Sequence, residues 1–234
     1  MGALTSAPVE EHLVDIADVG ASGLNRLLHT AGPAVRVRAV NPAGAHNLAV
    51  GLDRRHEVTI VGHAGYYCAG MNDGGVVRVE GAVGVGVAEN MMSGRVDVEG
   101  DASQSAAAIA HGGLLVIRGN ASARCAISLK GADVVVAGDV GHMSAFMAQA
   151  GRLLVCGDAG DALGDSIYEA RIYVRGRVAS LGADCIEKPM RAEHRGEVAG
   201  LIAHAGVDAD PAQFTRYGSA RGLYRFHSDN VRSY

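Results

Sequence analysis

The chain has 234 residues, of which 48% are hydrophobic, enough to bury a substantial core in one or two domains. Its formal net charge of −4 gives no electrostatic basis for binding nucleic acid or an anionic membrane surface. The N-terminal segment carries acids where a secretory signal carries bases, and no uncharged run is long enough to span a bilayer, so we expect a cytoplasmic protein.

Residues 1–42 are interpreted as an N-terminal cap segment. Within them, Ser22 is expected to start a short helix as its N-cap, and Gly32 follows the expected end of that helix. One face of the helix is apolar and holds Leu24, Leu27 and Leu28. Residues 35–40 then alternate between apolar and polar side chains, which predicts a strand.

Residues 43–195 repeat with a period of 19 residues, and missing such a repeat would misread the whole fold. A glycine ends each apolar burst at this interval: Gly62, Gly81, Gly100, Gly119, Gly138, Gly157 and Gly176. The string GAVGVGV adds Gly84 and Gly86. These two glycines are assigned to the coil rather than to a phosphate-binding loop, because no Lys-Ser/Thr pair follows them.

Two apolar columns recur after each glycine, with one mixed column between them. Fifteen residues on stand Val77, Val96, Leu115, Val134, Leu153 and Ile172. Seventeen residues on stand Val79, Val98, Ile117, Val136, Val155 and Val174. The mixed column holds Arg78, Asp97, Val116, Val135, Leu154 and Tyr173. This period-two pattern indicates one strand per coil with one face buried.

A further column, seven residues past each glycine, holds nothing larger than a methyl group. Its members are Ala69, Ala88, Ala107, Ala126, Ala145, Gly164 and Ala183. We interpret this column as a tight interior corner, where a longer side chain would collide with the opposite wall. We call it the alanine column.

A 19-residue coil without a helix of useful length excludes helical repeats, and the frame of leucine-rich repeats is absent. The sequence therefore predicts an all-β fold, a single-stranded parallel β-helix with short helical caps at both ends. Residues 196–234 are interpreted as a C-terminal helical cap and tail, in which Asp210 and Pro211 start a helix.

No catalytic, cofactor-binding or metal-binding residue is expected in this chain. Its cysteines form no C-x-x-C motif and are interpreted as buried thiols: Cys68, Cys125, Cys156 and Cys185. Polar residues do stack directly after four coil glycines: Asp101, Asn120, Asp139 and Asp158. We interpret them as turn residues that bond their own backbone, with a bound cation as the alternative.

Two segments are candidate interfaces. The first is rich in tyrosine and methionine, which suit an adaptable contact: Tyr66, Tyr67, Met71, Met91 and Met92. The second is the tail, with the aromatic and arginine enrichment of interface cores: Phe214, Arg216, Tyr217, Arg221, Tyr224, Arg225 and Phe226. The alternative for the tail is that its rings plug the open end of the β-helix.

The coils resemble one known family. The segments GHAGYYCAGMN, GAVGVGV, AENMMSG, GDASQS, GHMSAFM and GDALGDSIYEARIYVRG follow in the order found in the GXGXG domain. That domain is the last domain of the large subunit of glutamate synthase and also occurs in formylmethanofuran dehydrogenase. The chain is most similar to the stand-alone version, the glutamate synthase-like GXGXG polypeptide of N-methylglutamate synthase, over nearly its whole length.

The resemblance implies a right-handed β-helix without catalytic residues. Such a polypeptide would brace a glutamine-amidotransferase-like subunit against an FMN-binding glutamate synthase-like subunit that also holds an iron–sulfur cluster. The complex would make N-methylglutamate from methylamine and glutamate, and this chain would hold no cofactor. The alternatives are another glutamate synthase-like or formylmethanofuran dehydrogenase-like complex, or a polysaccharide-active β-helix enzyme, which would need paired acids.

Overall fold

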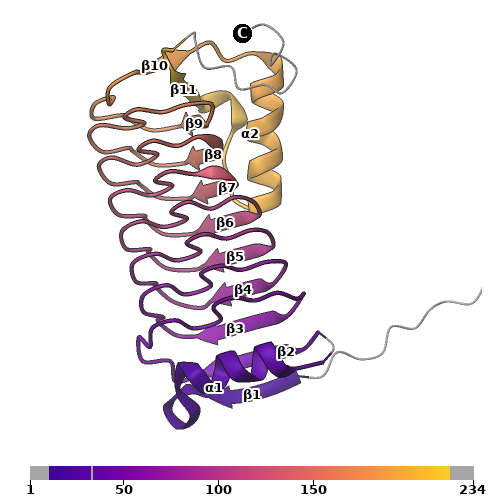
Figure 1. The fold of residues 1–234 in the computed structure, drawn as a ribbon. Coiled ribbons are helices and arrows are strands. Elements are labelled where there is room, and N and C mark those ends of the chain that lie inside the picture. The colour runs from indigo at the N-terminus through magenta and orange to yellow at the C-terminus, as the bar shows by residue number, and fades with distance from the viewer. Residues whose placement is uncertain (1–10, 33, 222–234) are drawn as a thin grey trace, which may run out of the picture.

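The computed structural model describes residues 11–32 and 34–221, which form an elongated stack of coils (Figure 1). Its strands are β1 (Glu11–Asp15), β2 (Arg36–Val40), β3 (Glu57–Val61), β4 (Val76–Val79), β5 (Arg95–Val98), β6 (Leu114–Ile117), β7 (Lys130–Val136), β8 (Ala150–Val155), β9 (Arg171–Val174), β10 (Cys185–Lys188) and β11 (Thr215–Ser219). The helices are α1 (Ile16–Thr30), α2 (Ala192–Ala205) and a 3-10 turn, η1 (Pro211–Gln213). No helix in these ranges is long and apolar enough to cross a membrane.

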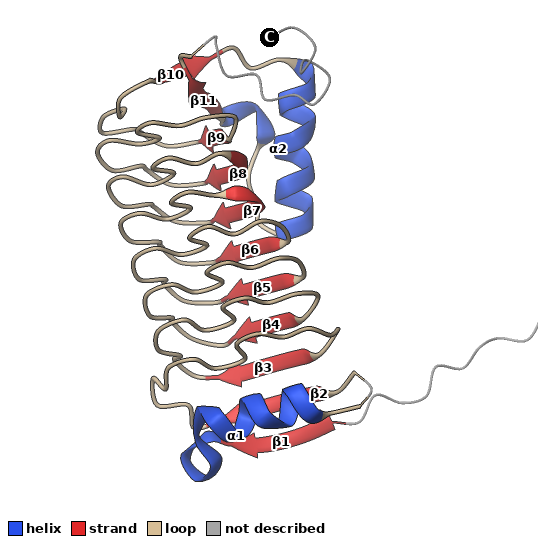
Figure 2. Ribbon diagram, in the orientation of Figure 1, coloured by secondary structure: helices blue, strands red, loops and turns tan. Residues whose placement is uncertain are grey.

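All described strands belong to one sheet, in the order β1 to β9, then β11, then β10. Every pair from β1 to β9 is parallel, and from β3 to β9 each inward-facing residue pairs with the residue 19 positions later, as Val77 does with Val96. Figure 2 shows one short strand in each coil, with loops making up the rest. The predicted right-handed parallel β-helix is confirmed.

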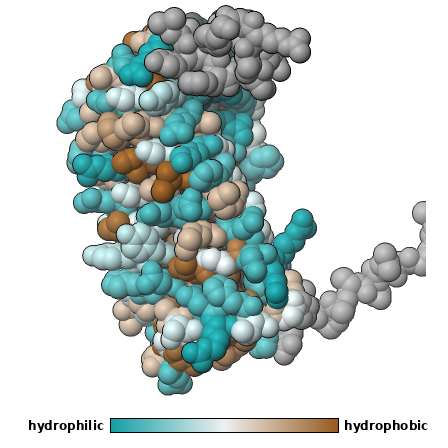
Figure 3. Space-filling model, in the orientation of Figure 1, coloured by the Kyte–Doolittle hydropathy of each residue, from teal (hydrophilic) through white to brown (hydrophobic). Residues whose placement is uncertain are grey.

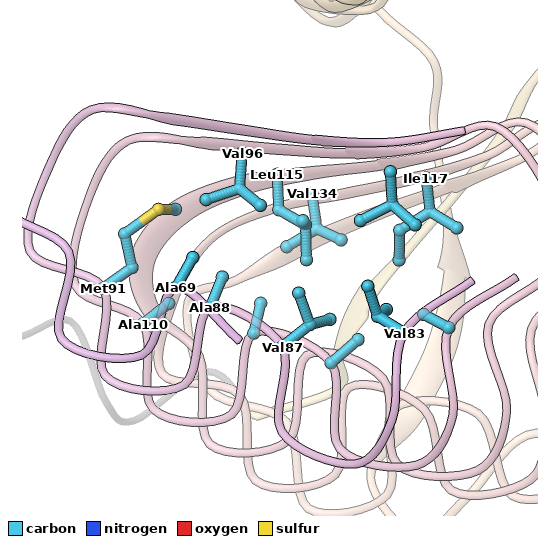
Figure 4. Packing of buried hydrophobic residues seen from close by; sticks show 14 of the residues in the cluster. Ala69, Val83, Val87, Ala88, Met91, Val96, Ala110, Leu115, Ile117 and Val134 are labelled. Atoms are coloured by element: carbon cyan, nitrogen blue, oxygen red, sulfur yellow. The ribbon is translucent and has the colours of Figure 1, made fainter. Parts of the chain in front are cut away.

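The core runs along the axis of the coils. Both predicted apolar strand columns are buried. A third column faces them from the opposite wall, and isolated β-bridges join its members from one coil to the next. That third column holds Ala64, Val83, Ala102, Ala121, Val140, Ala159 and Val178. Figure 4 shows Val83 and Val87 across the core from Leu115 and Ile117.

The alanine column lies in a wall built from left-handed backbone. In one coil, Arg124, Ala126 and Ser128 all have positive φ, between 51° and 59°. The N–H groups of Arg124 and Ser128 donate to the next coil, whereas that of Ala126 donates to Ala106 of the preceding coil. The alternation turns Ala126 inward, where it is fully buried. Left-handed backbone costs an L-residue roughly 1–2 kcal/mol, and these hydrogen bonds between coils offset that cost.

The prediction of a buried corner is wrong for Ala183, which is exposed. The last coil is one residue shorter than the others: Ala159 still pairs with Val178, 19 residues on, but Leu163 pairs with Leu181, only 18 residues on. Position 183 therefore moves out of the column. The other six members, from Ala69 to Gly164, are buried.

The coil glycines are needed because a side chain at their positions would collide with the preceding coil. A Cβ on Gly138 would lie 2.3 Å from Asn120 Oδ1 and 2.8 Å from the Gly119 carbonyl oxygen of the preceding coil. Asn120 Oδ1 is held there because it accepts from the backbone N–H of Asp139, at 2.9 Å. Asp101, Asp139 and Asp158 accept from the next coil in the same way. The prediction that these residues bond their own backbone is wrong, because the stacked N–H of the next coil lies within reach.

The N-terminal cap is a βαβ unit, in which α1 connects the parallel strands β1 and β2. The helix begins at Ile16 rather than at the predicted position, because Asp15 Oδ1 accepts from the Ala17 N–H at 2.9 Å. Gly20, with φ of 65°, interrupts the helix. The leucine face is as predicted: Leu24 and Leu28 are fully buried and close the bottom of the core.

The C-terminal cap differs more from expectation. Helix α2 was not predicted, and the boundary placed between residues 195 and 196 falls inside it. The helix predicted to start at Asp210 and Pro211 is the short turn η1, capped by Asp210 Oδ1 at 2.9 Å from the Ala212 N–H. After it, β11 pairs antiparallel with both β9 and β10 and so covers the last edge of the parallel ladder.

Helix α2 lies against the outer face of the strands, alongside the coils (Figure 1). Its seat is the mixed column, which is polar at Arg78 and Asp97 but apolar in the later coils. There Val116, Val135, Leu154 and Tyr173 form a second buried cluster with Val198, Leu201, Ala205 and Phe214. The side chain of Arg95 holds the C-terminal end of the helix by donating to the His204 carbonyl oxygen at 2.7 Å.

We predict that Ala126→Leu lowers the free energy of unfolding by about 1–3 kcal/mol or more, because the added carbons overpack a closed corner. Denaturant unfolding measures the change. The matched control is Ala203→Leu on the exposed face of α2, where a change within about 0.5 kcal/mol is expected. Equal stability of both variants would contradict the inward placement of the alanine column.

We also predict that Gly138→Ala destabilises the protein by about 1–3 kcal/mol, because its Cβ has no room against the preceding coil. Gly200→Ala in α2 is the matched control, since a Cβ there meets nothing within 4 Å. It should stabilise the helix by up to about 1 kcal/mol. Thermal unfolding of the two variants distinguishes them by sign, and destabilisation of both would refute the steric argument.

Candidate functional site

The first candidate interface lies on the outer turns of the early coils. Four of its five predicted residues are about half exposed, and we call them the tyrosine–methionine patch: Tyr66, Tyr67, Met71 and Met92. The fifth, Met91, is fully buried, so its assignment to the interface is wrong. Figure 4 shows Met91 turned toward the core. The face drawn in Figure 3 is largely hydrophilic, with apolar residues in small groups.

The two tyrosine rings rest on the glycines of the GAVGVGV string. A Cβ on Gly84 would lie 2.7 Å from Tyr66 Cδ1, and a Cβ on Gly86 would lie 2.9 Å from Tyr67 Cδ1. Tyr66 also stacks on the ring of His46, with centroids 4.5 Å apart. These glycines therefore let both rings lie across the next coil while half of each ring stays exposed.

A groove of about 240 Å³ opens beside the patch. Its lining includes Tyr67, Met71, Glu89 and Ile109. Burial raises the pKa of Glu89 above its ordinary value, because the carboxylate is partly removed from water. Flexible methionine and an aromatic ring are chemically suited to contact with another polypeptide.

The second candidate interface is mostly structural where it is described. Phe214 is 4% exposed and packs in the second buried cluster, so it is a core residue rather than a docking residue. Arg216 and Tyr217 belong to β11, and Tyr217 packs against the main core. Arg221 pairs with Asp184 and lies over the Tyr168 ring. The remaining predicted residues, Tyr224, Arg225 and Phe226, lie outside the described part of the chain.

A polar cluster joins the start of α2 to β9. The Glu197 carboxylate accepts from the Tyr173 hydroxyl and from the Arg171 guanidinium. Burial, reinforced by the hydrogen bond to Glu197, raises the pKa of Tyr173. Burial lowers the pKa of His194, whose Nδ1 accepts from the Arg191 N–H at 3.1 Å. The cluster fixes this end of α2 on the sheet.

The cysteines do not form a reactive centre. All four are buried and unbonded, and burial raises the pKa of Cys68 and Cys125 to about 12, which leaves almost no thiolate near neutral pH. Over residues 11–32 and 34–221, no group of three or more His, Cys, Asp or Glu side chains could hold a metal ion.

A concentration of cations near the C-terminal cap was not predicted from the sequence. Eight of the 21 lysines and arginines fall between residues 168 and 221. Five of these side chains line a single pocket: Arg171, Lys188, Arg191, Arg216 and Arg221. The density of basic residues could have indicated this pocket, but only the fold of α2 and β11 brings them together.

Comparison with known proteins places the chain in a family. No family model matches it. It is 59% identical over 226 residues to Protein GlxC of Rhizobium meliloti (strain 1021), a match that covers 95% of this chain and 99% of that protein. Identity at this level over nearly the full length of both chains shows that the protein belongs to the GlxC family.

Proposed function

We propose that this chain is a non-catalytic structural subunit of a glutamate synthase-like complex, and that the complex is N-methylglutamate synthase. The parallel β-helix, which is the fold that the resemblance to the GXGXG domain implies, supports the proposal, together with the match to GlxC over nearly the whole chain. In this role the chain braces a glutamine-amidotransferase-like subunit against an FMN-binding subunit with an iron–sulfur cluster. The complex converts methylamine and glutamate into N-methylglutamate and ammonia in the cytoplasm.

The architecture suits a brace. Successive coils are joined by backbone hydrogen bonds on several walls, including the strand ladder and the left-handed wall. Such a stack resists bending because bending would break many of these bonds at once. A stiff spacer holds two partners at a fixed separation, which a flexible linker does not do.

The tyrosine–methionine patch is the surface that we assign to a partner. Its exposed rings are supported from below by Gly84 and Gly86, so their ordering costs little entropy on binding. A polysaccharide-active enzyme is less well supported, because Glu89 is the only carboxylate among the described residues that line the adjacent groove.

We predict that the tagged chain copurifies with an amidotransferase-like and an FMN-binding polypeptide, and that Met71→Lys lowers recovery of one of them roughly tenfold or more. The control is Met147→Lys, because Met147 is also exposed and also has left-handed backbone, but lies four coils away. Quantitative mass spectrometry of the captured proteins is the measurement. Equal recovery with both variants would exclude the patch as the contact.

We further predict that the purified chain alone forms no N-methylglutamate from methylamine and glutamate, whereas the reassembled complex does. The assay uses chain that has been checked to be free of FMN and iron, with the product detected by mass spectrometry. Turnover by the chain alone would show that it is catalytic. A reassembled complex that leaves methylamine unreacted would instead indicate another glutamate synthase-like reaction.

A further inference from the structure

Helix α2 starts near β10 and β11, at the C-terminal end of the coils (Figure 1). A pocket of about 490 Å³ is lined by residues from these elements. Five basic side chains line it, but only two carboxylates among the described residues do, those of Glu169 and Glu193. Its volume is in the range of small-molecule sites. The excess of cations makes it attractive to an anion, although the whole chain is acidic.

Two of the five cations are already paired. Arg171 contacts Glu197, and Arg221 contacts Asp184. Arg191 lies 4.0 Å from Glu193, but its side chain is 72% exposed, so that contact is weak. Lys188 and Arg216 have no carboxylate within 4 Å over residues 11–32 and 34–221.

The guanidinium of Arg216 has a buried N–H group that no described residue accepts from. Its Nε is buried without a hydrogen-bond partner in the described part of the chain, and its Nη1 donates only to the Pro189 carbonyl oxygen, at 3.3 Å. Arg216 pairs across the sheet with Tyr173, close to Glu197. The Glu197 oxygens already accept from Tyr173 and Arg171. A buried guanidinium N–H without an acceptor is unfavourable, so an added acceptor would be stabilising here.

Helix α2 adds to the positive potential. Arg191, at its N-cap, and Glu193 and His194, in its first turn, all line the pocket. The first backbone N–H groups of a helix have no partner within the helix and attract anions. His194 adds no charge near neutral pH, because burial lowers its pKa and keeps its ring neutral.

We propose that this pocket binds a small anion with carboxylate or phosphate groups, held by Lys188, Arg191 and Arg216. Guanidinium groups match the paired oxygens of both anions. A recess of this volume favours a free small molecule over the side chain of a partner protein. This inference does not depend on the proposed function of the complex.

Isothermal titration of the full chain with sodium pyrophosphate, and separately with disodium glutarate, tests the proposal at constant ionic strength. We expect saturable binding of one probe or both, and the preferred probe distinguishes phosphate from carboxylate. Because each removes one cation from the pocket, Lys188→Gln and Arg191→Gln should each weaken binding roughly tenfold or more. Lys130→Gln, at an exposed lysine of β7, is the matched control and should bind as the unaltered chain does.

Thermal unfolding of each variant first establishes that it is folded, and the exposed Arg191 side chain makes Arg191→Gln the safer of the two. The site is supported if the unaltered chain binds a probe saturably, if both pocket variants bind it more weakly, and if Lys130→Gln binds it as the unaltered chain does. The proposal is overturned if neither probe saturates the unaltered chain, or if Lys130→Gln weakens binding as much as the pocket variants do.

Discussion

The hydrogen bonding of each coil to the next is the constraint on which the rest of the structure depends. Because the backbone of one coil pairs with the backbone 19 residues on, each side chain lies beside its own counterparts, about 4.8 Å away. A column can therefore hold only residues that tolerate this neighbour. Gly138 leaves room for Asn120, whose amide oxygen in turn accepts the Asp139 N–H. Ala126 fits an inward left-handed corner. The repeat in the sequence follows from this stacking.

This local and repeated constraint explains which parts of the fold were predictable. The strand columns, the alanine column and the leucine face of α1 could be read because each repeats a simple spacing. The unpredicted elements β1, β10, α2 and β11 occur once and depend on tertiary pairing. Helix α2 was hard to predict because it contains Gly196 and Gly200, and glycine disfavours helix. Its buried residues nevertheless lie on one face of the helix: His194, Val198, Leu201 and Ala205. Asp15 rather than Ser22 caps α1, and its side chain accepts from the Ala17 N–H.

The candidate interfaces were predictable to a smaller extent, because exposure depends on which way the chain turns at one residue. Met91 and Met92 are neighbours, yet one is buried and the other half exposed. Column membership separates them: the counterparts of Met91 in later coils are Ala110 and Leu129, whereas His111 and Lys130 follow Met92. For the tail, composition indicated an interface, but Phe214 enters the core beneath α2. Composition alone cannot distinguish a buried ring from a docking ring.

Departures from the repeat therefore indicate where this protein does something that a regular coil cannot. A periodic wall places residues of similar size side by side in successive coils. The mixed column breaks the pattern by turning apolar at Val116, and this change creates the seat of α2. Once seated, α2 directs its first turn toward β11, and the basic pocket forms between them. Tyr66 and Tyr67 break the pattern on another wall, where Gly84 and Gly86 accommodate their rings. Both surfaces that we assign to binding thus arise where the sequence departs from its own period.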